Sequence, residues 1–110
     1  MQTEYPFVLP RGYLSSQGAV FREGVLRLAR ADDEVGVLGD PRVASHRAYA
    51  VILLLSRCIV RLGSLEGDAI DERVVENLFS ADLAYLQERY REINGVAIEA
   101  KTCPHCGGLL

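Results

Sequence analysis

The sequence has few of the features that mark several large classes of protein. Of its twelve lysine and arginine residues only Lys101 is a lysine, and the eleven arginines are scattered without a basic block, in a chain of net charge -3. A nucleic-acid surface usually gathers such charges on one face, so we expect no nucleic-acid partner. The longest apolar run, 48–55, is far too short to span a bilayer, so we expect no membrane segment.

Cysteine is also scarce, with three residues in 110. An odd number makes a poor disulfide framework and suits a reducing compartment. The first twelve residues, MQTEYPFVLPRG, lack the basic segment followed by an apolar one that a signal peptide needs. These absences predict a cytoplasmic protein.

The first thirty residues are typical of β structure. The segments YPFVL, AVF and GVLRLA are rich in aromatic and β-branched residues or alternate in polarity, and SSQG at 15–18 signals a turn between them. They predict a β-hairpin or small antiparallel sheet, which needs helices to pack against because it would not be stable alone.

The rest of the chain predicts helices, and therefore an α+β fold. A short helix should follow Asp32 as its N-cap, loosely held because of glycines at 36 and 39. Three main helices should follow, and capping residues mark where they begin and end. The first runs over about 43–62 and ends at Gly63, the second begins after Asp71, and the third runs from about Ser80 to Asn94-Gly95 with Asp82 in its first turn.

The sequence pattern after Gly95 differs from that of the predicted helices. Residues 96–102 alternate in polarity like a short strand, and a CxxC knuckle follows. We therefore predict one α+β domain over 1–95 and a C-terminal tail over 96–110.

Three arginines share an arc of roughly 100° on the predicted helix over 43–62. They are Arg47, Arg57 and Arg61. A solvated helix edge is the simplest interpretation, and a partner-binding strip is the alternative. Pairing with acidic residues of the last predicted helix, such as Glu88 and Glu92, would explain the arginines without a partner.

The CPHCGG stretch that begins at Cys103 is locally typical of a zinc knuckle. A tetrahedral site needs four ligands, and Cys103 and Cys106 supply two. Two chains could pool their thiolates in a homodimer, a partner could complete the site, or the knuckle could bind nothing. A redox CxxC is a weaker fourth interpretation, because the βαβ context is missing. The cofactor is thus none, or zinc shared between chains.

The sequence contains no pattern that predicts catalysis. It has neither a nucleophile elbow nor a glycine-rich phosphate loop. The acidic run 32–34 could suggest a divalent ion but more simply matches the dipole of a helix start. Cys58 is expected to be an inert core thiol, and His46 a solvated residue. We predict a protein that is not an enzyme.

Several stretches together resemble a known family. They are FVLPRGYLSSQGAVFREGVLRLARADDEV, DPRV, AYAVILLLSRCIVRLGSL and VVENLFSADLAYLQERYREIN. In these residues the chain resembles the small tail assembly proteins of contractile phage tails and phage-like contractile injection systems. The resemblance covers about residues 4–106, and 78–94 carries it most clearly.

The resemblance implies a non-enzymatic role. Such proteins are thought to act as assembly chaperones for the tape-measure protein or the tail tube protein. The resemblance also leaves open a minor structural component of the tail or baseplate. A zinc-knuckle adaptor is a third possibility.

Overall fold

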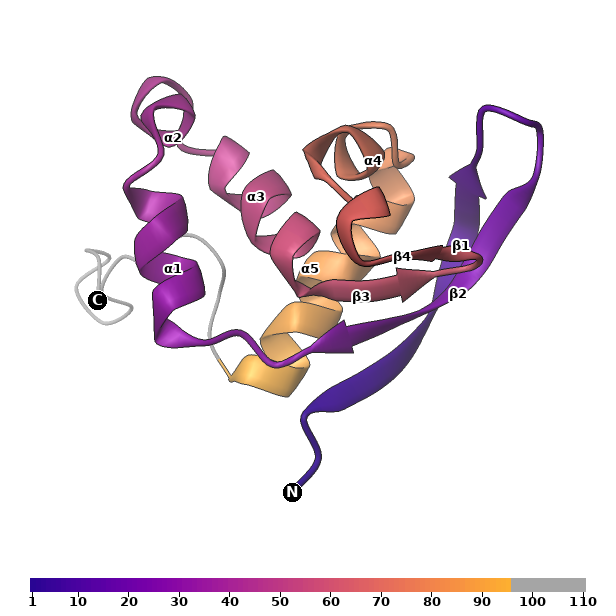
Figure 1. Ribbon diagram of the computed structural model, residues 1–110, viewed down its shortest axis with the longest axis horizontal. Coiled ribbons are helices and arrows are strands. Elements are labelled where there is room, and N and C mark those ends of the chain that lie inside the picture. The colour runs from indigo at the N-terminus through magenta and orange to yellow at the C-terminus, as the bar shows by residue number, and fades with distance from the viewer. Residues whose placement is uncertain (96–110) are drawn as a thin grey trace.

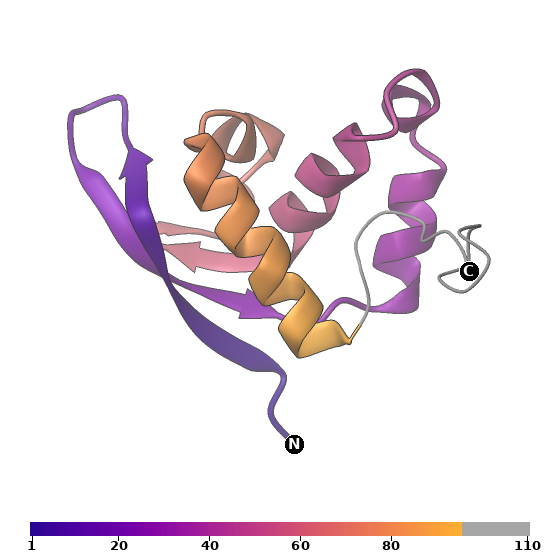
Figure 2. The same cartoon turned by 180° about the vertical axis from the view of Figure 1, so that it is seen from behind.

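The computed structural model describes residues 1–95, which form an antiparallel sheet of order β1-β2-β3-β4 covered by helices (Figure 1). Seen from behind, α5 lies across the sheet and packs against β1 (Figure 2). The helix α1 and the tip of the β1–β2 hairpin lie at opposite ends of the molecule in both views. The predicted α+β class is confirmed. The predicted C-terminal strand lies outside the described residues.

The predicted hairpin is confirmed as β1 (Glu4–Leu14) and β2 (Val20–Arg27). The Ser15 hydroxyl accepts a hydrogen bond from the backbone N–H of Ala19 at 3.0 Å, which closes the predicted turn. The ladder pairs Val8 with Glu23 and Tyr13 with Phe21, so residues 9–12 form a bulge opposite one residue of β2. A bulge of this kind bends a strand and redirects its backbone groups.

The predicted single helix over 43–62 is wrong. The chain instead forms α2 (Pro41–Ser45), an exposed break at 46–48, α3 (Tyr49–Cys58) and the strand β3 (Ile59–Leu62). Asp40 caps α2, because its carboxylate accepts the N–H of Arg42 at 2.8 Å and Pro41 suits the first helical position.

Gly63 belongs to a hairpin turn and does not end a helix as predicted. It has a φ of +60° and lies with residue 64 between β3 and β4 (Leu65–Glu66). Phe21 packs so closely over it that a side chain at 63 would clash with the ring. A β-branched segment followed by Gly-Ser is itself a hairpin signal, so the sequence did contain the evidence for this turn.

The helix ends were predicted with mixed success. After the short 3-10 turn η1 (Gly67–Ala69), the predicted N-cap Asp71 is confirmed, because its carboxylate accepts N–H groups at the start of α4 (Glu72–Glu76). The helix α5 (Ser80–Asn94) ends at Gly95 in the left-handed conformation, as expected. The predicted cap Asp32 is wrong, because α1 (Ala31–Leu38) begins two residues earlier than expected, with Arg30 as its N-cap.

Buried apolar side chains form two separate clusters. The main core joins the sheet, α3, α4 and α5, and includes Phe7, Leu26, Leu55, Leu86 and Tyr90. The satellite cluster lies between α1, α2 and another face of α3. Its buried members are Val37, Val43, Ala50, Leu53 and Leu54. Because α3 contributes to both clusters, the sequence correctly marks its apolar residues as central, although the helix is shorter than predicted.

Candidate partner-binding site

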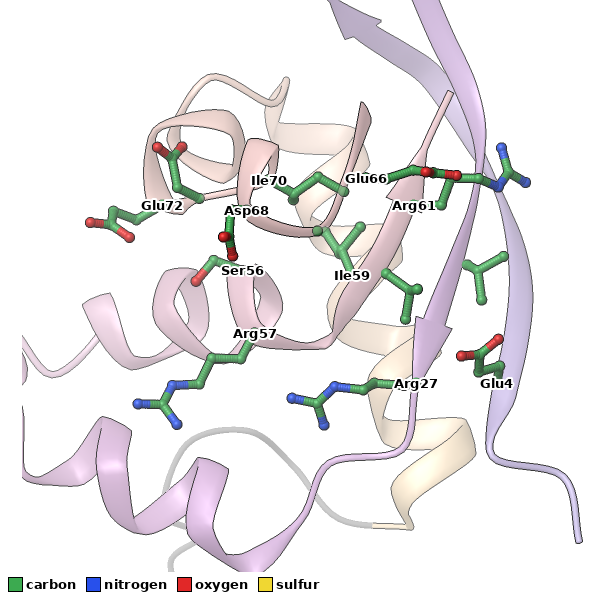
Figure 3. A pocket seen from close by; sticks show the side chains of 14 residues that line it. Glu4, Arg27, Ser56, Arg57, Ile59, Arg61, Glu66, Asp68, Ile70 and Glu72 are labelled. Carbon is green, nitrogen blue, oxygen red and sulfur yellow. The ribbon is translucent and has the colours of Figure 1, made fainter. Parts of the chain in front are cut away.

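A groove of about 860 Å³ opens beside β2 and β3, and we call it the charged groove (Figure 3). The end of β2, the end of α3, β3, η1 and the start of α4 all contribute to it. Its aliphatic lining comes from Val25, Ile59, Val60 and Ile70. Charged side chains surround these residues on several sides, so the groove combines apolar and ionic surface.

The arginines of the groove reach in from separate elements. Figure 3 shows Arg27, from β2, and Arg57, from the end of α3, extending towards the same side. Arg61 comes from β3, where it lies opposite Glu66 in the β3–β4 ladder. One guanidinium nitrogen of Arg61 donates to the carbonyl of Gly63 at 3.1 Å, which leaves its other donors available.

Carboxylates line the other sides of the groove. Asp68 and Glu72 lie across from Arg27 and Arg57, and Glu4 lies on β1 (Figure 3). Glu72 accepts a hydrogen bond from Arg42 at 3.3 Å. Asp68 has no hydrogen bond or ion pair to another residue of the described part of the chain. Acidic and basic side chains therefore alternate around the groove, because Glu4 lies beside Arg27 and Glu66 lies beside Arg61 (Figure 3).

Arg27 and Arg57 converge on the buried carboxylate of Asp33. Arg27 binds it through two nitrogens at 2.8 and 3.0 Å, and Arg57 lies 3.6 Å away. The backbone N–H of Arg30 donates to the same group at 2.8 Å. The hydrogen bonds from Arg27 outweigh the effect of burial and lower the pKa of Asp33 to about 2. Asp33 thus stays ionised and attaches α1 to β2 and α3.

The structure separates the three arginines of the predicted strip. Arg57 and Arg61 both line the charged groove, but they belong to a helix and a strand, so they share no helix face. Arg47 lies in the exposed break at 46–48 and is not part of the groove. A partner-binding role for the three residues stays a prediction, although the continuous helix on which it depended is wrong.

The alternative pairing of these arginines with the last helix is also wrong. Arg57 pairs with Asp33, whereas Glu92 pairs with Arg89 at 3.3 Å. Glu88 pairs with Arg91. Glu88 and Glu92 are therefore paired within α5, and they do not neutralise the charged groove.

Asp82 has a role that the sequence reasoning missed. It is fully buried, and its two carboxylate oxygens accept the backbone N–H groups of Arg11 and Gly12 in the β1 bulge, at 2.8 and 3.0 Å. Further along α5, Tyr85 accepts the N–H of Val8 at 3.2 Å and Arg89 donates to the carbonyl of Pro6 at 3.0 Å. These contacts cover the outer edge of β1, which would otherwise invite pairing with another strand.

A second, mainly apolar groove of about 650 Å³ lies where α2, α3 and α5 meet. Tyr49, Ile52 and Leu83 supply much of its lining. The guanidinium of Arg42 lies 5.3 Å from the centre of the Tyr49 ring, and the Tyr49 hydroxyl bonds to Glu76. The end of α2 and the break at 46–48 contribute Ser45, His46 and Ala48 to the lining.

Within residues 1–95 no group of three or more His, Cys, Asp and Glu side chains is placed to hold a metal ion. In the acidic run 32–34, the carboxylate of Asp33 is paired with Arg27 and Arg57. Cys58 is fully buried, which confirms its predicted place in the core, and burial raises its pKa to about 11. Cys103 and Cys106 lie outside the described residues, so zinc at the knuckle stays a prediction.

None of the helices within residues 1–95 is long and apolar enough to cross a bilayer. The chain matches no family model, no curated protein and no solved structure.

Proposed function

We propose that this chain is a non-enzymatic, cytoplasmic assembly protein of contractile phage tails or phage-like contractile injection systems. It acts as a chaperone for the tape-measure or tube protein. The resemblance of the residues quoted above, chiefly 78–94, is the basis for the family. The charged groove is the structural observation that supports a protein partner.

The chemistry of the groove suits a segment with one apolar side and charges flanking it. Aliphatic residues such as Val25 and Val60 can receive apolar side chains, while Arg61 and Asp68 keep groups available for ionic contacts. A tape-measure protein is long and helical in the family that the chain resembles, and it must be held until the tube polymerises around it. An amphipathic stretch of such a protein is the partner that we propose.

Co-expression with the tail tube and tape-measure proteins of the same particle tests this proposal. We expect a soluble complex with one of them, and Arg61→Glu should weaken it at least several-fold because it reverses a charge in the groove. Arg11→Glu is the matched control, since Arg11 is exposed and lies outside the groove. Unchanged partner solubility and no complex would contradict the proposal.

Purified mature particles then distinguish a chaperone from a structural subunit. A chaperone should be absent from them by quantitative mass spectrometry. If the chain is present in stoichiometric amount, it is a minor component of the tail or baseplate.

A further inference from the structure

The helix α1 contributes little to the structure that it covers. Of its eight residues only Asp33 and Val37 are buried. Val35 and Leu38 leave 70% and 67% of their surface exposed. A helix of this length is unstable by itself, and Gly36 weakens it further. Its position therefore depends mainly on these two side chains, with one further hydrogen bond, which the hydroxyl of Tyr90 donates to Glu34 at 3.3 Å.

Those two side chains lie four residues apart, so they point from the same face of α1. Val37 packs on α3 within the satellite cluster, against Leu53 and Leu54. Asp33 binds Arg27 and Arg57. We call this surface of α3, together with the two guanidinium groups, the α1 seat.

Gly36 shows how closely the seat fits a helix. A Cβ atom at this position would come within 2.7 Å of a guanidinium nitrogen of Arg57, so the arginine lies directly across α1. The sequence predicted that this glycine loosens the helix. The structure adds a second consequence, because the missing side chain allows the contact with Arg57.

Removing α1 would expose apolar side chains of the seat and leave its guanidinium groups unpaired. The satellite cluster would expose the aliphatic side chains of Leu53 and Leu54, and two guanidinium groups would lose their carboxylate. A helix with an aspartate or glutamate four residues before an aliphatic side chain would again cover the leucines and pair the guanidinium groups. A partner helix with more apolar contacts than the single Val37 would bind there more tightly than α1 does.

We propose that α1 is an autoinhibitory element, which a partner helix of the pattern acidic-x-x-x-aliphatic displaces from the seat. The seat itself supports this choice of occupant, since its shape already accommodates a helix and its charge requires a carboxylate. The identity of the natural helix, as part of the tape-measure or tube protein, rests on the function proposed above. The displacement of α1 does not.

A synthetic peptide can test the displacement without any tail protein. The probe is an alanine-rich helix of about twenty residues, long enough to be helical, that carries one Glu-x-x-Gly-Leu segment, with glycine at the place of Gly36 because a Cβ atom there would meet Arg57. A second peptide with lysine in place of the glutamate is its control. Binding to the full-length chain is measured by fluorescence anisotropy, and protection of the α1 and α5 amides by hydrogen exchange.

Asp33→Asn should release α1 and raise the affinity for the glutamate peptide about tenfold, because less binding energy is spent on displacing α1. Asp32→Asn is the matched control, since Asp32 is exposed and makes only a long contact with Arg30 at 3.9 Å. Val37→Ala should also release α1 and raise the affinity for the peptide, because it removes apolar contact with the satellite cluster. Bound peptide should remove protection from α1 and leave α5 protected.

The proposal is overturned if the peptide binds neither folded variant, binds them no better than the wild type, or binds equally well with lysine. Protection of α1 that survives peptide binding would also overturn it. Failure here leaves the co-expression result standing. Conversely, a tail protein that binds while α1 stays protected would support the proposed function and refute the displacement.

Discussion

Two buried carboxylates, Asp82 on α5 of the main core and Asp33 on α1 of the satellite cluster, are used in different ways. Asp82 connects α5 to the β1 bulge, joining residues about seventy positions apart in the sequence. Asp33 connects α1 to an arginine six positions away and to Arg57. The contacts of Asp82 thus join distant parts of the chain, whereas those of Asp33 attach the short helix α1, whose separate detachment is the proposal made above.

A matched pair of substitutions on α3 should separate the two clusters most strongly. Leu55 is fully buried in the main core and Leu53 is 6% exposed in the satellite cluster. Leu55→Asp should abolish cooperative unfolding, because an unpaired carboxylate in the core costs several kcal/mol. Leu53→Asp should leave the sheet and α5 folded while the amides of α1 lose their protection. Circular dichroism and hydrogen exchange distinguish these outcomes, and equal global unfolding by both variants would show that the clusters are one unit.

Replacing the carboxylate of the main core should have the next largest effect. Asp82→Ala leaves two backbone N–H groups of the bulge without acceptors, and we expect a loss of about 3 kcal/mol in the free energy of unfolding. Urea denaturation measures this loss. Asp68→Ala is the control, because Asp68 is exposed, and it should change the free energy by less than about 0.5 kcal/mol. Similar values for the two variants would contradict the role assigned to Asp82.

The carboxylate of the satellite cluster should show a smaller effect that depends on pH. The pKa of Asp33 falls from an ordinary 3.8 to about 2 because of Arg27. A lowered pKa stabilises the docked state above the ordinary value, so this contribution, about 2 kcal/mol, should be complete above pH 4 and be lost as the pH falls towards 2.

NMR titration of the α1 amides over this range checks the prediction. Asp33→Asn should remove the transition, and Asp32→Asn should preserve it. A transition of α1 that persists in Asp33→Asn would assign the pH dependence to another group.

The parts of the fold that were predicted correctly have local causes. The hairpin follows from its turn residues and alternating strands, the start of α4 from Asp71, and the end of α5 from Gly95. The break at 46–48 and the strand β3 were missed, because a continuous apolar run fits a buried helix and a buried strand equally well. The capping pair Asp40-Pro41 and the Gly63 turn were local signals that could have corrected the prediction.

The candidate site was less predictable than the fold. The sequence pattern indicated Arg57 and Arg61, and both line one groove. The reason was wrong, however, because it placed them on one face of a continuous helix. It treated Asp33 and Asp82 as first-turn residues that match a helix dipole. Their partners, Arg27 and the bulge at Arg11 and Gly12, come from other elements, so no spacing within either helix could indicate them.

The sequence by itself determined the α+β class, the hairpin, the helix caps at Asp71 and Gly95, and the central place of the apolar residues of α3. Turns, caps and periodicity act between residues a few positions apart, and they are therefore visible in the sequence. The tertiary structure alone decided that α3 serves two clusters, that α5 covers the edge of β1, and that two arginines meet at Asp33. These features depend on which distant surfaces come together. A hydrogen bond or an ion pair becomes stronger when it is buried, and it is buried only after the surrounding elements have packed.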